Sequence, residues 1–267
     1  MKVFITGGTG LVGSAVVAEL VAAGHTVTAL SRSASSAERA EAAGATPLRG
    51  SLTDLEVLRA GAERAEALAA LAGPLIGTGR PLVTVAGTPV APGRASTEED
   101  PLPTEGPVGG RSESVARVLA LAPRGVRAAA VRLPRTVHHD GRGGFAGLLT
   151  EHARRTGVAG YPGDGAQRWP AVHALDAAVL FRLALEEAPG GSSWHAVADE
   201  GVAVRAIASV IGRRLGLPVE SVPEEAFGPL GPVFATDQPA SGARTRAGLG
   251  WTPVRPGLLA DLENLGG

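Results

Sequence analysis

The chain begins Met1-Lys2-Val3-Phe4-Ile5-Thr6-Gly7-Gly8-Thr9-Gly10-Leu11-Val12-Gly13, and this stretch decides the fold. Its apolar start predicts a strand, and the Ala- and Val-rich pattern from Ser14 to Ala23 predicts a helix. Between them the glycines follow the spacing G-x-x-G-x-x-G. Gly7 permits a tight turn, Gly10 lets backbone N–H groups approach a pyrophosphate, and Gly13 lets the helix pack on the strand. This order predicts dinucleotide binding rather than a glycine-rich turn of an unrelated α/β protein.

Composition narrows the class of protein. A chain of 267 residues, 44% hydrophobic and 19% charged, can form one globular domain, or a large and a small one. The net charge of −1 argues against broad attraction to nucleic acid or membrane, and the absence of cysteine excludes disulfides and thiolate metal sites. No long apolar run predicts a membrane span, and the first strand leaves no room for a signal peptide. We therefore expect a cytoplasmic location.

The end of the second strand bears on the choice of cofactor. The segment His25–Leu30 predicts this strand, and Ser31, Arg32 and Ser33 follow it. In dinucleotide folds this position faces the adenosine ribose, where an acidic residue suits NAD and an arginine suits the 2′-phosphate of NADP. No acidic residue occurs here, so these three residues favour NADP(H) over NAD(H). A solvated Arg32 on a surface loop is the rival interpretation.

The alternation of helix and strand continues. Helix Ser36–Ala43 and strand Thr46–Arg49 are predicted next, followed by a loop that ends in Thr53 and Asp54. Asp54, or else Thr53, caps a helix over Leu55–Gly61. The same loop lies near the adenine ring in dinucleotide folds, so both residues are also candidates for cofactor contact.

Segments along nearly the whole chain form a combined pattern: Thr6–Gly13, Gly50–Asp54, Gly79–Val83, Val131–Pro134, Gly163–His173 with Asp176, and Leu249–Pro253. Together they resemble the extended and atypical short-chain dehydrogenases/reductases of the NAD-dependent epimerase/dehydratase type. The resemblance implies an α/β fold, a Rossmann-type doubly wound parallel sheet with a small C-terminal substrate domain. It implies a dinucleotide-binding domain over 1–137 and a mainly substrate-binding region over 138–267, of which 171–198 returns to the Rossmann core.

The family pattern is shortened between residues 60 and 82. The family has a fourth strand and a long helix before its fifth strand, yet only residues 55–85 separate Asp54 from Ala86. One assignment makes Glu63–Leu75 the helix and leaves out the fourth strand. The other makes Leu68–Gly73 the strand and leaves out the helix. The strong helix formers at the start of this segment favour the first assignment.

The catalytic residues that the resemblance implies do not occur. The family uses a serine after the fifth strand and a Tyr-x-x-x-Lys pair on the next helix, in which the tyrosine transfers the proton. Here Ala86 falls at the serine, Gly109 at the tyrosine and Glu113 at the lysine. The single tyrosine, Tyr161, and the single lysine, Lys2, lie elsewhere, so no realignment restores the pair.

Other residues are candidates for the missing chemistry. His138 follows the predicted strand Ala128–Leu133 and is the candidate for proton transfer, because imidazole titrates near neutrality. A histidine that only hydrogen-bonds the backbone is the alternative. The resemblance places this loop beside the nicotinamide, with Pro134 close to the ring. Thr88 and Ser112 are candidates to replace the hydroxyl of the absent serine, and each is otherwise an ordinary local hydroxyl.

The segment Gly163–His173 crosses the substrate cleft in the family that the chain resembles. Arg168 and Trp169 are therefore candidates to contact an anionic or planar substrate, and Tyr161 joins them as one of few aromatic residues. A place in the core is the alternative for the two aromatic residues. We expect the last histidine of the segment and Asp176 to be structural.

The expected activity is that of an NAD(P)-dependent oxidoreductase of the short-chain dehydrogenase/reductase type, acting on a small-molecule carbonyl or alcohol with non-standard catalytic residues. We expect no nucleic-acid, membrane or metal partner, and a homodimer is one option for the assembly. A non-redox isomerase, dehydratase or cyclase on the same fold, or a non-enzymatic dinucleotide-binding sensor, are the alternatives. The residues of the turn expected to contact the cofactor are Gly7, Thr9, Gly10, Leu11, Val12 and Gly13.

Overall fold

The computed structural model describes residues 1–54, 56–58, 67–68, 75–105 and 109–266. Its centre is a seven-stranded parallel sheet in the order β10-β6-β5-β4-β1-β2-β3. Strands β2 and β3 follow on one side of β1, and strands β4, β5, β6 and β10 follow on its other side. This is the doubly wound topology that the glycine turn predicts. The strands of this sheet are β1 (Lys2–Ile5), β2 (Thr26–Ser31), β3 (Thr46–Arg49), β4 (Ala67–Leu68), β5 (Pro81–Gly87), β6 (Arg127–Leu133) and β10 (Ser192–His195).

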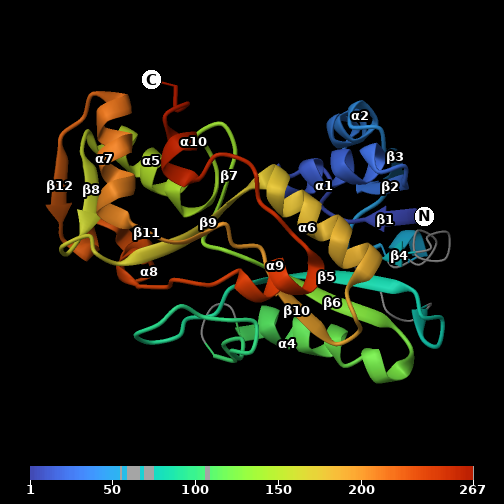
Figure 1. Cartoon of the computed structure of the whole chain (residues 1–267). Helices are drawn as coiled ribbons and strands as arrows, with labels where there is room; N and C mark the ends of the chain where they lie inside the picture. Colours follow the sequence, from blue (N-terminus) through green and yellow to red (C-terminus); the bar gives the residue numbers. More distant parts are fainter. Residues whose placement is uncertain (55, 59–66, 69–74, 106–108, 267) are drawn as a thin grey trace.

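Helices cover both faces of this sheet (Figure 1). Side chains alternate along β1, so Val3 and Ile5 join the core beneath α1 and α6, while Phe4 joins the core of the opposite face. None of the helices in the described ranges is both long and apolar enough to cross a membrane. On the first face lie α1 (Leu11–Ala22), α2 (Ala34–Ala42) and α6 (Ala174–Glu187), and on the second lies α4 (Gly109–Leu119), which the short helix η2 (Ala122–Arg124) follows.

A second cluster of elements stands beside the carboxyl ends of β5 and β6, at the left of Figure 1. It contains a three-stranded sheet in the order β11-β9-β7 and a parallel pair of β12 with β8. Its core contains Trp169, Phe234 and Ile207. The elements are β7 (Thr136–His138), α5 (Gly144–Thr156), β8 (Ala159–Pro162), β9 (Arg168–His173), β11 (Asp199–Ala203), α7 (Val204–Leu215), β12 (Val219–Val222), η3 (Glu224–Leu230), α8 (Gly231–Ala235) and α10 (Leu258–Leu262).

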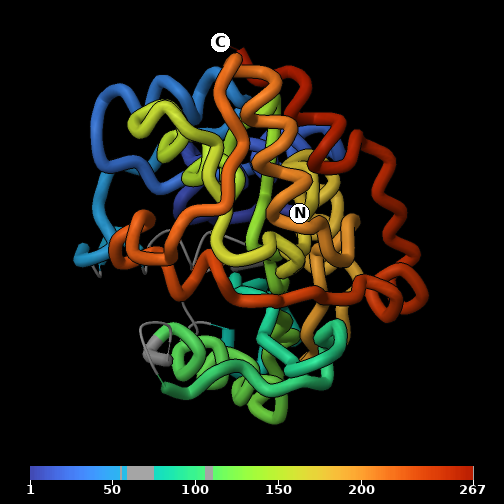
Figure 2. The backbone as a smooth tube through the Cα atoms, turned by 90° about the vertical axis from the view of Figure 1, so that its left-hand side faces the viewer, coloured from blue at the N-terminus to red at the C-terminus, as the bar shows by residue number. Residues whose placement is uncertain are grey.

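Two segments join the parts of the molecule. After β9, helix α6 runs back against α1, where Arg182 Nε donates to Glu19 Oε1 at 2.7 Å, and β10 then pairs with β6. The loop after β5 runs beside the stretch that precedes α9 (Ala243–Leu249), and Ser96 forms a bridge there with Ala240 (Figure 2). The C-terminal region is therefore tied to the large sheet at more than one place.

The shortened region departs from the preferred assignment. Ala67 and Leu68 form β4, which pairs in parallel with Val3 and Phe4 of β1, and through Leu68 with Leu82 of β5. The assignment of Glu63–Leu75 as a helix without a fourth strand is wrong at these two residues, because pairing with both neighbours outweighs helix propensity. The remainder of that range, apart from Leu75, lies outside the described residues.

Candidate functional site

The turn between β1 and α1 has the geometry that its glycines require. Gly7 has a φ of +73°, in the left-handed region that favours glycine. The N–H of Gly10 donates to the carbonyl of Gly7 at 3.2 Å and closes the turn. A Cβ on Gly13 would lie 2.0 Å from the same carbonyl oxygen. Only glycine allows α1 to approach the turn this closely.

Gly10 is not required by the packing of the protein itself. A Cβ there would meet only the carbonyl oxygen of Gly7, at 3.7 Å, which is an ordinary contact. Gly10 is also the N-cap of α1, without a side-chain cap, and no acidic residue lies in the first turn of the helix. The N–H groups of this turn and the positive end of the helix dipole therefore suit an anion such as a pyrophosphate. The absence of a side chain at Gly10 leaves room for it.

The three residues after β2 have different roles. Ser31 is buried, and its hydroxyl donates to the carbonyl of Ala29 at 3.3 Å. Ser33 is the N-cap of α2, where it forms a capping box with Ser36. Both serine side chains thus serve local structure, while the side chain of Arg32 is exposed.

The loop after β3 has the capping geometry that was one of its two interpretations. Asp54 Oδ1 accepts a hydrogen bond from the N–H of Val57 at 3.3 Å, and residues 56–58 are helical. The hydroxyls of Thr53 and Ser51 lie 2.7 Å apart. Both predicted residues are exposed, so capping leaves their surfaces open to a ligand.

His138 is buried and paired with a carboxylate from the far end of the chain. Its Nδ1 lies 2.8 Å from Asp261 Oδ2, which also accepts from the N–H of Gly141 at 3.0 Å. Only 1% of the His138 side chain is exposed, and its Nε2 has no hydrogen-bond partner among the described residues. The simple alternative, a loop histidine bonded only to the backbone, is therefore wrong for His138. The carboxylate fixes the Nδ1–H tautomer and leaves the lone pair on Nε2.

Electrostatics around this pair favour an ionised aspartate. Burial acts to raise the pKa of Asp261, but the hydrogen bonds from His138 and Gly141 outweigh it and hold the pKa below its ordinary value. The ring of His173 meets that of His138 edge-on, with centroids 5.4 Å apart. Burial, and then the neighbouring His138, lowers the pKa of His173. A neutral His173 therefore stands beside the pair near neutral pH.

The structure brings the His138 loop next to the glycine turn. A Cβ on Gly143 would lie 2.5 Å from Leu11 Cδ2 and 3.7 Å from His138 Cα. The first residue of α1 therefore lies against the loop that follows β7. Pro134, at the carboxyl end of β6, is buried. The start of α1 and the loop that follows His138 thus lie next to each other.

The candidate hydroxyls differ in their surroundings. Thr88 follows β5, is buried, and its Oγ1 has no partner among the described residues. Its backbone is fixed by the carbonyl of Leu133, at 2.9 Å, and by Gln238 Nε2, which donates to the Thr88 carbonyl at 2.5 Å. Ser112 lies in the first part of α4 and is half-buried. Ala86 packs in the small core under α4.

The three residues predicted to contact a substrate lie in different surroundings, and the prediction is wrong for Trp169. The Trp169 side chain is 0% exposed and packs against Phe145 and Phe234, so it cannot contact a substrate. Arg168, its neighbour on β9, points the other way and forms an exposed ion pair with Asp237 at 2.8 Å. It lines an open polar cleft of about 460 Å³ that shares no residue with the cavity at the glycine turn. Tyr161 is half-buried on β8.

His173 and Asp176 have the structural roles expected of them. His173 is the N-cap of α6, and its Nδ1 accepts from the N–H of Leu175 at 3.2 Å. The Asp176 carboxylate accepts from the N–H groups of Val254 and Arg255, at 3.2 and 2.9 Å. These bonds attach the segment after α9 to the start of α6.

Sequence reasoning missed a buried polar cluster at the carboxyl ends of β6 and β10. Glu98 Oε1 accepts from Thr245 Oγ1 at 2.7 Å and from the N–H of His195 at 3.2 Å. Arg132 stands opposite His195 in the strand register, and its Nη1 donates to the carbonyl of Asp100 at 2.9 Å. Burial lowers the pKa of His195 to about 4, against the opposing effect of Glu98. The sequence signal that could have predicted this cluster is the presence of charged or titratable residues in the strands Arg127–Leu133 and Ser192–His195.

Comparison with known proteins decides the family. The model of the NAD dependent epimerase/dehydratase family matches residues 3–83. The uncharacterized protein C2A9.02 of Schizosaccharomyces pombe is 39% identical over 293 positions, which cover 99% of each chain. The uncharacterized protein YLL056C of Saccharomyces cerevisiae is 37% identical over 294 positions, which cover 98% of each chain. The chain belongs to the NAD dependent epimerase/dehydratase family.

Both alignments run over more positions than this family member has residues, so the two relatives contain segments that it lacks. Solved structures of the same fold include a UDP-glucose 4-epimerase of Thermotoga maritima with UDP-glucose, at 19% identity and a TM-score of 0.76, covering 99% of this chain and 97% of that one. A dTDP-glucose 4,6-dehydratase of Bacillus anthracis in complex with NAD has 15% identity and a TM-score of 0.74, covering 99% and 95%. At these identities the likeness concerns the fold.

Proposed function

We propose that this chain is an NAD(P)-dependent oxidoreductase of the short-chain dehydrogenase/reductase type that prefers NADP(H) and acts on a small-molecule carbonyl or alcohol. The observation that carries the proposal is the uncapped N-terminus of α1 together with an exposed Arg32 directly after β2, the strand that pairs with β1. The first suits a pyrophosphate, and the second adds a guanidinium where the 2′-phosphate of NADP would lie. Neighbouring structures of the same fold are complexes with NAD, which supports the dinucleotide site in general.

The residues at the expected catalytic positions imply a different proton donor. Ala86 carries no hydroxyl and packs in the core, and neither Gly109 nor Glu113 can replace a Tyr-Lys pair. The bound cofactor would supply or accept the hydride at the substrate carbon. We assign proton transfer at the substrate oxygen to His138 Nε2, because Asp261 already holds Nδ1–H. The lone pair on Nε2 would accept the hydroxyl proton when an alcohol is oxidised, and the imidazolium would return that proton when a carbonyl is reduced. Thr88 and Ser112 are the hydroxyls proposed to orient the substrate oxygen, and Tyr161 and Arg168 are proposed to line the approach of the substrate.

Calorimetric titration with NADPH, NADP and NAD tests the cofactor site. We expect micromolar binding of NADPH, and Arg32→Ala to weaken NADPH and NADP by about tenfold to a hundredfold, the value of a charge-assisted hydrogen bond. NAD affinity should stay unchanged, since NAD has no 2′-phosphate. An equal loss for all three dinucleotides would contradict the role of Arg32, and no binding of any of them would contradict the proposal as a whole.

The burial of His138 favours one alternative function, a dinucleotide-binding sensor. Only 1% of the His138 side chain is exposed, so a substrate contacts this residue only if the protein gives it access to Nε2. If Nε2 is never reached, the chain is a dinucleotide-binding protein without hydride chemistry, a sensor on the same fold. Dinucleotide binding without turnover of any carbonyl or alcohol in a substrate screen would favour the sensor, and turnover would exclude it.

A further inference from the structure

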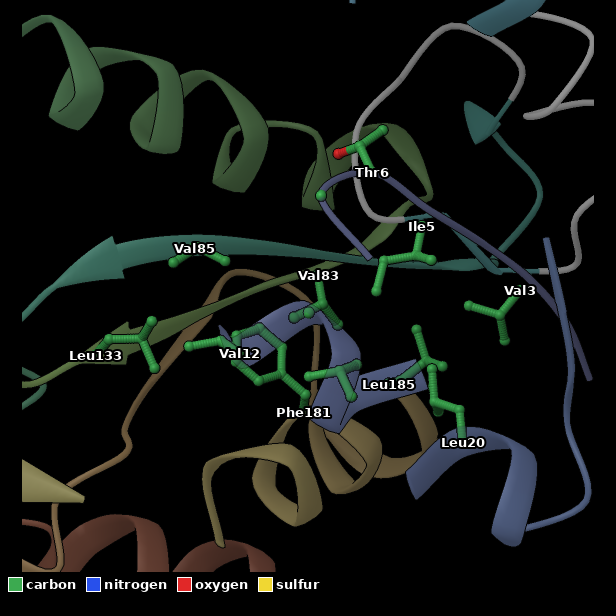
Figure 3. A pocket seen from close by; sticks show the side chains of 13 residues that line it. Val3, Ile5, Thr6, Val12, Leu20, Val83, Val85, Leu133, Phe181 and Leu185 are labelled. Atoms are coloured by element: carbon green, nitrogen blue, oxygen red, sulfur yellow. The ribbon is translucent and has the colours of Figure 1, made fainter. Parts of the chain in front are cut away.

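Arg135 carries a half-buried positive charge that the proposed mechanism does not use. The residue lies in the turn between β6 and β7, shortly before His138. The N–H of Phe145 donates to the Arg135 carbonyl at 3.2 Å and so attaches this turn to the start of α5. Arg135 does not line the cavity at the glycine turn, whose wall includes Val12 and Phe181 (Figure 3). The guanidinium is therefore not part of the site assigned to the pyrophosphate.

Aromatic rings and one carbonyl fix the position of the Arg135 guanidinium. Its central carbon lies 5.1 Å from the ring centre of Phe145 and 5.8 Å from that of Trp169, within the range of a cation–π contact. Its Nη1 donates to the carbonyl of Val233 at 2.7 Å. Nε is buried, and neither Nε nor Nη2 donates to any of the described residues. The edge formed by Nε and Nη2 thus has a fixed orientation and two unused donors in this part of the chain.

Other arginines of the chain show how such donors are satisfied. Arg168 presents the same edge to a carboxylate, and its Nε and Nη2 donate to the two oxygens of Asp237 at 3.1 and 2.8 Å. Arg127, which is half-buried like Arg135, donates to two backbone carbonyls at the carboxyl end of α6, the negative end of that helix. Within the described ranges Arg135 has one carbonyl and no carboxylate.

The surroundings of Arg135 favour an anion as its partner. Burial lowers the pKa of Arg135 to about 10, so the guanidinium keeps its charge near neutral pH. The adjacent rings of Phe145 and Trp169 exclude water, which destabilises an unpaired charge and strengthens its attraction to an opposite one. Because the side chain is only half-buried, an anion from solvent can reach it. A carboxylate or a phosphate accepts two parallel hydrogen bonds from such an edge.

We propose that Arg135 binds an oxyanion of the substrate, a carboxylate or a phosphate group, through Nε and Nη2. This inference rests on the proposed function and deepens it, because it makes the substrate an acidic carbonyl compound or alcohol. A neutral analogue would leave the guanidinium unpaired, so the site discriminates against it. The turn that carries Arg135 leads directly to His138, so one short segment supplies both the anion-binding and the proton-transfer residue.

Inorganic phosphate and acetate are the probes for this site. The full-length chain is titrated calorimetrically at constant ionic strength, saturated with NADPH so that the glycine turn is occupied. We expect saturable binding of one anion, and the tighter probe indicates the acidic group of the substrate. Arg135→Gln should weaken this binding at least tenfold, while the matched control Arg117→Gln, at an exposed arginine of α4, should not change it. Unchanged affinity in Arg135→Gln, or no saturable binding of either anion, would overturn the proposal.

Two further variants keep the test decisive. If Arg135→Gln does not fold, Arg135→Lys replaces it: lysine keeps the charge without the planar edge, so anion affinity should fall severalfold, and unchanged affinity would overturn the proposal. If NADPH does not bind, the titration is made on the free chain. Loss of phosphate binding in Arg32→Ala but not in Arg135→Gln would then place the anion beside the glycine turn and overturn the proposal. Failure of the cofactor proposal is thereby distinguished from failure of this one.

A matched pair of substrates tests the substrate class. For an acid that the substrate screen shows to be turned over, the fully esterified, uncharged analogue should have a kcat/KM at least tenfold lower. Arg135→Gln should remove this preference by raising KM for the acid more than it lowers kcat, because Arg135 binds the substrate away from the reacting atoms. Equal kcat/KM for the two compounds, or turnover of neutral compounds alone, would overturn the proposal.

Discussion

The two ring nitrogens of His138 differ in their hydrogen bonding. Its Nδ1 is held by Asp261, and the same carboxylate oxygen holds Gly141, so the ring cannot turn without breaking a buried charge-assisted bond. Nε2 is left without a partner in the described part of the chain. A buried polar atom without a partner costs stability, and such atoms are found where a ligand or a reaction uses them.

The variant His138→Asn separates structure from chemistry at this residue. The amide of asparagine can donate to Asp261 in place of Nδ1–H, while the group at Nε2 is lost. We expect the variant to fold and to bind NADPH like the wild type, and kcat to fall by at least a hundredfold, the contribution of a general acid or base. Steady-state kinetics and calorimetry measure the two effects. Unchanged turnover in a folded variant would remove His138 from the reaction.

At the scale of elements, the β1–α1 unit contains two glycines with different reasons to exist. Gly13 allows the helix to pack, since a Cβ would lie 2.0 Å from the Gly7 carbonyl oxygen. Gly10 meets only an ordinary contact at 3.7 Å. The first glycine therefore serves the fold, and the second serves whatever approaches the end of the helix.

Alanine substitutions should distinguish these two roles. Gly13→Ala should lower the free energy of unfolding by about 3 kcal/mol or more, because the backbone of the turn must move to relieve the overlap. Gly10→Ala should change stability by about 1 kcal/mol at most, the scale of an N-cap change, yet weaken NADPH at least tenfold by occupying its approach. Chemical denaturation and calorimetry report the two quantities. Tight NADPH binding by Gly10→Ala would show that the pyrophosphate does not pass Gly10.

At the scale of the whole molecule, a buried polar cluster joins segments that are far apart in sequence. Glu98 comes from the loop after β5, His195 from the end of β10 and Thr245 from α9. His195 Nδ1 also lies 3.0 Å from the carbonyl of Ser241, which fixes the neutral ring with its proton on Nδ1. The C-terminal segment is thereby held against the edge of the large sheet, and it is burial that disfavours the charged form of His195 there.

The burial of His195 predicts a dependence of stability on pH. The pKa of His195 is lowered from 6.5 to about 4 by burial, so between these values the unfolded chain binds a proton that the folded chain does not. The free energy of unfolding should therefore fall by roughly 3 kcal/mol as pH decreases from about 6.5 to about 4. The lowered pKa values of His152 and His173 add to the same trend. The lowered pKa of Asp261 acts only below this window.

Urea denaturation of the wild type and of His195→Asn across this range measures the contribution. Asparagine keeps a donor for the Ser241 carbonyl and does not titrate, so the variant should show a markedly flatter profile. A decline as steep as that of the wild type would assign the pH dependence to other groups.

The sequence by itself determined the α/β class, the glycine turn and most element positions. The strand at Thr46–Arg49 has the predicted bounds, because its pattern is local. The roles of His173 and Asp54 as helix caps were also predictable, since a cap acts within a few residues of its own position.

Only the tertiary structure decided the rest, because those features depend on residues that meet through folding. No local pattern pairs His138 with Asp261, 123 residues away, or buries Trp169 rather than exposing it. Helix propensity pointed away from a strand at Ala67 and Leu68, yet pairing with β1 and β5 makes them one. Local propensity is a weak term, and contacts between distant segments outweigh it.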